Sequence, residues 1–80
     1  MEALARAVPT YVAAQIIGKS EDFIRWGLQQ GRLPIGNAVR SSYGSRWSYY
    51  ISPKLLSKYT GVDVEDINRM ADEYRGRRKW

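Results

Sequence analysis

The chain reads TYVAAQIIGKSEDFIRWGLQQGRLPIGNAVRSSYGSRWSYYI over residues 10–51. The apolar, alanine-rich residues 11–17 predict a first short helix. Thr10 is a good N-cap for this helix, because a threonine hydroxyl can accept from a free backbone N–H of the first turn. Gly18 suits the left-handed position after a helix, and Ser20 suits the cap of a following one. The two helices are therefore predicted to be joined by a tight turn.

A second helix is predicted over residues 21–30, and it is followed by a turn at GRLP, residues 31–34. Its apolar residues recur at the spacing of one helical face, which predicts a stripe that faces the core. The members of this stripe are Phe23, Ile24, Gly27 and Leu28. Gly27 lowers helix propensity by about 1 kcal/mol relative to alanine, and a close approach of the first helix would explain it. Trp26 is expected to be a structural anchor at the edge of the core.

Residues 37–40 and 46–51 predict two antiparallel strands around the polar, glycine-containing residues 41–45. Side chains alternate between the two faces of a strand. We expect one face of the second strand, made of Trp47, Tyr49 and Ile51, to pack on the helices. The opposite face is made of Arg46, Ser48 and Tyr50, and Arg46 is expected to be exposed at the end of the hairpin.

Two further helices are predicted beyond this hairpin. Ser52 followed by Pro53 is a typical helix start, since serine caps a helix and proline fits its first position. This third helix is expected to run to about Tyr59. Asp63 is expected to cap a fourth helix over residues 64–74.

The length of 80 residues allows one domain, and a hydrophobic content of 44% is enough for one small core. We expect a single domain over residues 1–80, mostly α-helical with a small β-hairpin and about four helices. Its core is expected in residues 10–60, with the fourth helix packed beyond it. Residues 75–80, RGRRKW, are expected to form a frayed basic tail.

The composition excludes several classes of function. The chain has no cysteine and no histidine, so it has neither a disulfide framework nor the usual metal ligands or general base. It also has no nucleophile–base pair and no phosphate-binding loop, and we expect no enzymatic activity, no cofactor and no metal. Because no apolar run is long enough for a membrane span and the start lacks a signal-peptide pattern, we expect a cytoplasmic protein.

The net charge points to a polyanionic partner. The chain carries 13 lysine and arginine residues against 8 acidic ones, for a net charge of +5 at pH 7. A positive net charge favours binding to the phosphate backbone of a nucleic acid, because lysine and arginine release the counterions bound to the phosphates. The order helix, tight turn, helix, basic hairpin also predicts a winged helix-turn-helix, the arrangement that puts one helix and one hairpin against double-stranded DNA.

Residues 10–59 resemble the excisionase and MerR-like winged-helix DNA-binding families of bacteria and their phages. The resemblance is carried by AA (residues 13–14), IGKS (17–20), FIRW (23–26), GRLP (31–34) and SPKL (52–55). It implies that the second helix lies in the major groove and that the hairpin crosses the DNA backbone or minor groove. It also implies a small phage or prophage protein in the bacterial cytoplasm, an excisionase or a transcription regulator, with a recombinase or another phage protein as a further partner.

Eight residues of this segment are the candidate DNA contacts. They are Lys19, Arg25, Gln29, Arg32, Arg40, Ser42, Tyr43 and Arg46. Arg25 is expected to project away from the core, where it could reach guanine or a phosphate, and the hairpin supplies phosphate donors. Glu21 and Asp22 depart from the polar or basic start of the family's recognition helix, because acidic groups repel phosphate. This departure shifts the expected contacts towards the turn, the middle of the helix and the hairpin.

Two functions are therefore open. The first is sequence-specific or architectural DNA binding. The alternative is a protein-interaction module in a phage packaging or replication complex, which would use the acidic helix start together with Tyr43, Trp47 and Tyr50. The acidic start favours the second function, and the basic hairpin and the net charge favour the first.

Overall fold

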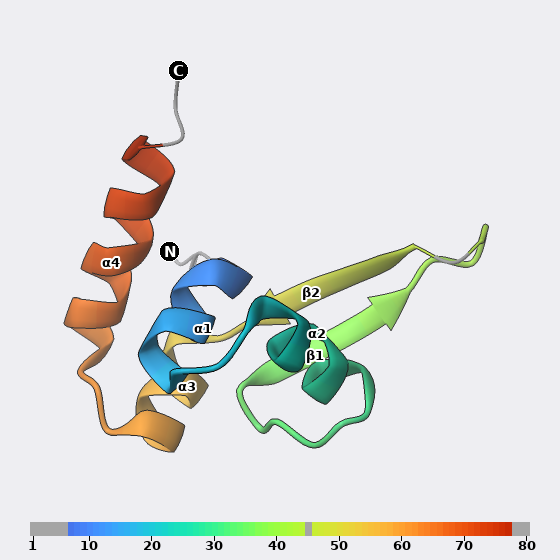
Figure 1. Ribbon diagram of the computed structural model, residues 1–80, viewed down its shortest axis with the longest axis horizontal. Coiled ribbons are helices and arrows are strands. Elements are labelled where there is room, and N and C mark those ends of the chain that lie inside the picture. The colour runs from blue at the N-terminus through green and yellow to red at the C-terminus, as the bar shows by residue number, and fades with distance from the viewer. Residues whose placement is uncertain (1–6, 45, 78–80) are drawn as a thin grey trace.

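The computed structural model describes residues 7–44 and 46–77, and these ranges contain four helices and one two-stranded hairpin (Figure 1). The elements are α1 (Thr10–Ile17), α2 (Glu21–Gln29), β1 (Gly36–Arg40), β2 (Trp47–Ile51), α3 (Pro53–Thr60) and α4 (Val64–Arg77). Figure 1 shows α1, α3 and α4 grouped on one side, α2 beside the base of the hairpin, and the hairpin extending away from the helices. The chain is thus mostly helical with one small hairpin, as its sequence predicts.

The helix boundaries follow from local capping chemistry. Gly18 has a φ of 84°, and its N–H donates to the Ala14 carbonyl, which ends α1. The Ser20 hydroxyl accepts from the Phe23 N–H at 3.1 Å and caps α2. The Ser52 hydroxyl caps α3 in the same way, at 3.2 Å from the Leu55 nitrogen. These predicted caps are confirmed.

Thr10 does not cap α1. Pro9 occupies the N-cap position, and Thr10 is the first residue of the helix. The Thr10 hydroxyl instead donates to Glu21 Oε1 of α2 at 2.9 Å. The predicted cap is wrong because the hydroxyl donates to an acceptor on the next helix. The local sequence pattern does not show that this helix lies beside Thr10.

The core lies where all four helices meet the base of the hairpin. Five large side chains of the described residues are less than 2% exposed, and they come from α2, the loop after it, β2, α3 and α4: Ile24, Ile35, Ile51, Leu56 and Ile67. The buried residues of α1 are smaller: Val12, Ala13 and Ala14. Burial of each of these large apolar side chains stabilises the fold by about 1.5–3 kcal/mol. Because each element contributes so few of them, each one matters to the stability of the whole core.

Gly27 lies on the buried face of α2, but its close neighbour is Leu33 and not α1. A Cβ placed on Gly27 would lie 2.6 Å from Leu33 Cδ1. The loop after α2 folds back onto the helix, since the Arg32 N–H donates to the Gly27 carbonyl at 2.8 Å. The prediction that α1 requires this glycine is therefore wrong: the glycine makes room for the returning loop.

The hairpin pairs Gly36 with Ile51 at its base and Arg40 with Trp47 at its outer end. The predicted alternation is confirmed, because Ser48 and Tyr50 are exposed while the other face is partly or fully buried. Ile51 is buried, and Tyr49 and Trp47 are both half-buried, but of these two only Tyr49 packs against the core. The outer half of the hairpin therefore extends beyond the helices, and Trp47 packs on them less than predicted.

Helix α4 continues to Arg77, three residues past its predicted end. It is held to the rest of the fold at both ends. Ile67 is fully buried, and the Tyr74 ring stacks on Tyr11 of α1 with centroids 5.0 Å apart. The Arg75 guanidinium donates to the Ala7 carbonyl. The first residues of the predicted basic tail are thus helical, and residues 78–80 lie outside the described residues.

None of the helices in residues 7–44 and 46–77 combines the length and the apolar character needed to cross a membrane.

Candidate nucleic-acid interface

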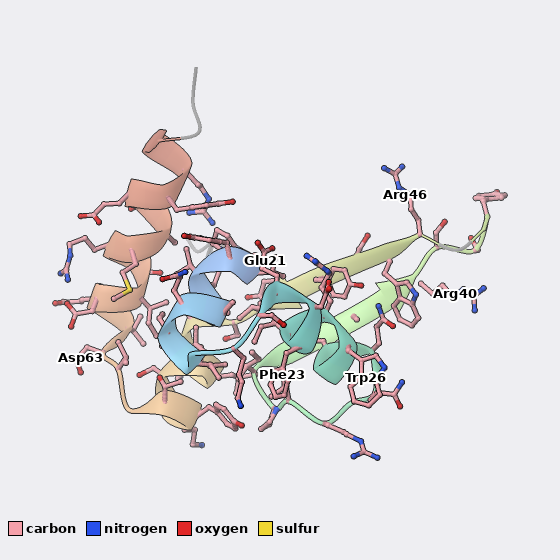
Figure 2. All side chains as sticks on the ribbon, viewed as in Figure 1. Glu21, Phe23, Trp26, Arg40, Arg46 and Asp63 are labelled. Atoms are coloured by element: carbon pink, nitrogen blue, oxygen red, sulfur yellow. The ribbon has the colours of Figure 1, made fainter. Side chains whose placement is uncertain are left out.

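Four of the eight candidate residues gather at the outer end of the hairpin. Arg40, Ser42, Tyr43 and Arg46 are all exposed, and Tyr43 is 94% exposed. Figure 2 shows Arg40 and Arg46 on opposite sides of this end, both directed away from the helices. Neither guanidinium forms an ion pair with any described residue. The outer end of the hairpin therefore projects from the molecule and exposes one positive charge on each of its two sides.

Local hydrogen bonds shape this end of the hairpin. The Ser41 N–H donates to the Arg46 carbonyl at 2.7 Å, which continues the strand pairing by one more bond. The Ser41 hydroxyl accepts from the Tyr43 N–H at 3.1 Å, which starts the turn. Gly44 has a φ of 130°, a conformation that residues with a side chain rarely adopt. The turn thus presents Tyr43 at the far end of the molecule.

Arg25 is the fifth candidate, and the structure pairs it with both acidic residues of its own helix. Its Nη1 lies 3.2 Å from Glu21 Oε1, and its Nη2 lies 2.8 Å from Asp22 Oδ1. The hydrogen bond that Arg25 donates to Asp22 is the main reason that the pKa of Arg25 is raised above its usual value; desolvation opposes this rise, and the bond to Glu21 adds to it. The guanidinium is therefore held in place by the acidic residues of its own helix.

Gln29 connects α2 to the hairpin. Its Nε2 donates to the Tyr49 hydroxyl of β2 at 2.6 Å. Both side chains are half-buried. The predicted site residue thus fixes the position of the hairpin relative to α2, because this bond joins the middle of one strand to the last turn of the helix.

The two remaining candidates flank α2. Lys19 lies in the turn before it, with its Nζ 5.5 Å from the centre of the Phe23 ring. Arg32 follows the helix and is exposed. These two residues place a cation just before α2 and another just after it, while the first turn of the helix itself is acidic.

Two aromatic residues of α2 are exposed, although the sequence did not identify them as surface residues. Phe23 is 42% exposed and Trp26 is 56% exposed, although a core stripe and a structural anchor are predicted. They lie three residues apart on the outer side of α2, and Figure 2 shows both on the side of the helix away from Glu21. The buried face of α2 is narrow, made of Ile24, Gly27 and Leu28. The apolar residues of α2 span a wider arc of the helix than this narrow face can bury. That excess is the sequence signal that could have identified the two exposed aromatic residues.

These aromatic side chains border a shallow groove of about 450 Å³ on the outer face of α2. The groove is lined by aromatic rings, by the Arg25–Asp22 ion pair and by the hydrogen-bonded side chains that join α2 to the hairpin. The lining residues are Ser20, Asp22, Phe23, Arg25, Trp26, Gln29 and Tyr49. The groove therefore joins the α2 surface to the base of the hairpin. It is open enough to receive an edge of a larger molecule.

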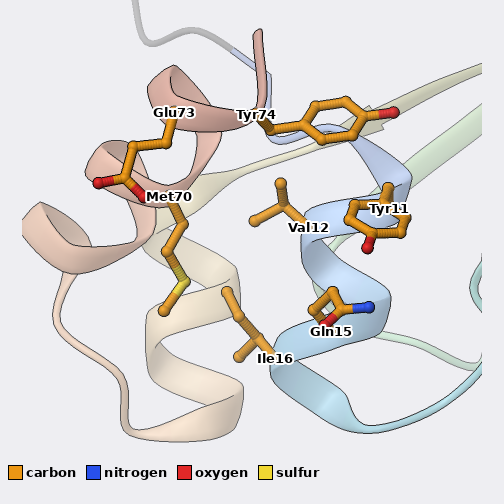
Figure 3. Close-up of a pocket in the computed structure, with 7 residues that line it drawn as sticks. All are labelled: Tyr11, Val12, Gln15, Ile16, Met70, Glu73 and Tyr74. Atoms are coloured by element: carbon orange, nitrogen blue, oxygen red, sulfur yellow. The ribbon is translucent and has the colours of Figure 1, made fainter. Parts of the chain in front are cut away.

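A second pocket lies away from this interface. It holds about 320 Å³ between α1 and α4 and is lined by Tyr11, Val12, Ile16, Met70 and Tyr74 among others (Figure 3). None of the eight candidate residues lines it. No group of three acidic side chains in the described part of the chain is arranged to hold a metal ion.

Comparison of the chain with protein-family models, with curated proteins and with solved structures gave no match.

Proposed function

We propose that this chain is a small winged helix-turn-helix protein that binds double-stranded DNA, with α2 facing the major groove and the hairpin as its wing. The observation that carries the proposal is the outer end of the hairpin. Arg40 and Arg46 are exposed there without ion-pair partners among the described residues, and they point to opposite sides of a projecting element. Arginine and backbone N–H groups at such a position suit phosphate oxygens on either side.

The connection between helix and hairpin supports the same proposal. A winged helix binds DNA with two elements at once, so their relative position matters. The Gln29–Tyr49 hydrogen bond of 2.6 Å fixes that position before DNA arrives. An interface that is held in place in the free protein loses less conformational freedom on binding.

The two elements have different roles in this proposal. The hairpin, Lys19 and Arg32 supply the phosphate contacts, because their cations are exposed and form no ion pair with another described residue. The first turn of α2 carries Glu21 and Asp22, which repel phosphate and favour a contact with base edges. We propose an excisionase-like or transcription-regulating role of phage or prophage type in the bacterial cytoplasm, with a recombinase or another phage protein as a further partner.

A salt-titrated binding assay on a labelled duplex tests the proposal. If about 4–6 phosphates are contacted, log K should fall against log[salt] with a slope of roughly −4 to −5. The double variant Arg40→Ala/Arg46→Ala should reduce the slope by about two, because each arginine accounts for about one phosphate. A wild-type protein that binds no duplex even at low salt would contradict the proposal.

A second function is favoured by the exposed aromatic residues of α2. Phe23 and Trp26, 42% and 56% exposed, form an apolar surface of the kind that anchors protein–protein interfaces. This alternative is an interaction module on the same scaffold, in a phage packaging or replication complex. The salt titration separates the two, because the interaction module does not need duplex DNA.

A further inference from the structure

The structure links four side chains at the start of α2 into one network. The Thr10 hydroxyl donates to Glu21 Oε1 at 2.9 Å, and the same oxygen accepts from Arg25 Nη1 at 3.2 Å. Arg25 Nη2 donates to Asp22 Oδ1 at 2.8 Å. Each terminal nitrogen of the guanidinium is thus held by a different carboxylate, and one of these carboxylates is itself held from α1.

The network holds Arg25 without covering it. The Arg25 side chain is 37% exposed and borders the groove on the outer face of α2. A guanidinium has five N–H donors in a planar fork. The two carboxylate contacts use two of them, so three remain for a partner, which is enough for a bidentate pair.

The charges around Arg25 decide what that partner can be. Two carboxylates accompany one guanidinium, and the Asp22 side chain is 91% exposed. A phosphate approaching this turn would meet an excess of negative charge, whereas the edge of a base carries no net charge. Guanine presents two acceptors, O6 and N7, in the major groove, and a bidentate arginine is their commonest partner.

We propose that Glu21 and Asp22 are specificity-determining residues, which hold Arg25 in position to read a guanine and keep the start of α2 from binding phosphate. This inference rests on the proposed DNA-binding function. Arg25 makes the base contact, and the two acidic residues are positioning residues that act through it. The acidic start of α2 disfavours binding to the DNA phosphate backbone. Through Arg25, it helps the protein to discriminate between DNA sequences.

The test uses the full chain and a pool of random duplexes, from which the preferred sequence is selected. Binding is then measured on the selected duplex and on a scrambled one at the same salt concentration. Arg25→Ala should weaken binding to the selected duplex by about 5- to 150-fold more than binding to the scrambled duplex. Arg25→Lys keeps the charge but loses the bidentate geometry, so it should lose the preference while keeping the salt slope.

The acidic residues are tested by substitutions that preserve their shape. Asp22→Asn and Glu21→Gln should tighten binding to the scrambled duplex and lower the ratio of the two affinities. Replacing the contacted guanine by 7-deazaguanine removes one acceptor, so it should weaken wild type and have no effect on Arg25→Ala. Thermal unfolding of each variant, followed by circular dichroism, shows whether it is folded.

Arg69→Ala is the matched control. Arg69 forms the same kind of i,i+3 ion pair, with Asp66 at 2.8 Å, but it lies on α4, on the other side of the molecule from the hairpin. Its removal should change neither affinity nor preference.

Three results would overturn the inference while duplex binding itself persists. These are the absence of any preferred sequence, equal losses for Arg25→Ala on both duplexes, and an unchanged affinity ratio for both Asp22→Asn and Glu21→Gln. Failure of the wild-type protein to bind any duplex would overturn the proposed function as well.

Discussion

At the scale of single residues, two glycines of this chain lie inside helices for different reasons. Gly27 is buried in α2, and a Cβ there would lie 2.6 Å from Leu33 Cδ1 and 2.7 Å from Leu33 Cγ. Leu33 is itself only 6% exposed, so it has little room to move. Gly76 lies in the last turn of α4, and a Cβ there would meet nothing within 4 Å. One glycine is therefore a packing requirement, and the other carries only the cost of low helix propensity.

We predict opposite effects for alanine at these two positions. Gly27→Ala should lower the free energy of unfolding by up to about 2 kcal/mol, because overpacking outweighs the gain of about 1 kcal/mol in helix propensity. Gly76→Ala should raise it slightly, by less than about 1 kcal/mol near a helix end. Urea denaturation of both variants measures the difference. Equal stabilisation by the two substitutions would mean that Leu33 moves aside without cost.

At the scale of elements, the position of the hairpin depends on a few contacts at its base. Ile51 is fully buried and Tyr49 packs on the core, whereas the outer end projects beyond the helices. The Gln29–Tyr49 hydrogen bond is the polar contact, among those of the described residues, that joins the hairpin to α2. Loss of this bond should therefore loosen the hairpin more than it affects the helices.

Tyr49→Phe tests this connection. Removing the hydroxyl should lower the free energy of unfolding by about 0.5–1.5 kcal/mol, and it should weaken DNA binding modestly because the hairpin is less well positioned. Tyr50→Phe is the matched control, since Tyr50 is 41% exposed on the opposite face of β2. Its stability should stay within about 0.5 kcal/mol of wild type. A control variant that loses as much as Tyr49→Phe would mean that the loss is not specific to this contact.

The elements also show how far the sequence predicts this molecule. The caps at Ser20 and Ser52 and the helix end at Gly18 were predicted correctly, because each depends on residues within one turn. Two of the errors involve contacts between one element and the next: the Thr10 hydroxyl bonded to α2, and the loop packed on Gly27. In the candidate site, the exposure of Arg40 and Arg46 was predicted because both residues flank the turn of the hairpin. The ion pairs of Arg25 needed side-chain positions, although their i,i+3 and i,i+4 spacing is visible in the sequence.

At the scale of the whole molecule, a single small core holds all the elements. α4 packs against α1 and α3 and closes one side of this core, with Ile67 fully buried and Ala71 3% exposed. A domain of this length typically has about 4–12 kcal/mol of stability in total. The loss of one large core side chain from α4 is therefore expected to affect the hairpin on the other side of the molecule as much as α4 itself.

Ile67→Ala should lower the free energy of unfolding by about 2–5 kcal/mol, and the whole chain should still unfold in one step. The measurement is urea denaturation followed by two probes, far-ultraviolet circular dichroism for the helices and tryptophan fluorescence for α2 and the hairpin. A Trp80→Phe background restricts the fluorescence to Trp26 and Trp47. Met70→Ala on the same helix is the control, because Met70 is 36% exposed and its truncation should cost about 1 kcal/mol or less.

Coincident transitions for the two probes are expected for one cooperative unit. If Ile67→Ala instead shifts the helix signal to lower urea and leaves the fluorescence transition in place, α4 unfolds separately from the remainder. The surface formed by α2 and the hairpin would then not depend on α4, and the variant should keep the duplex affinity of the wild type. If the transitions coincide, the same variant should lose binding in step with the fraction of unfolded protein, because the hairpin is positioned by the core that α4 completes.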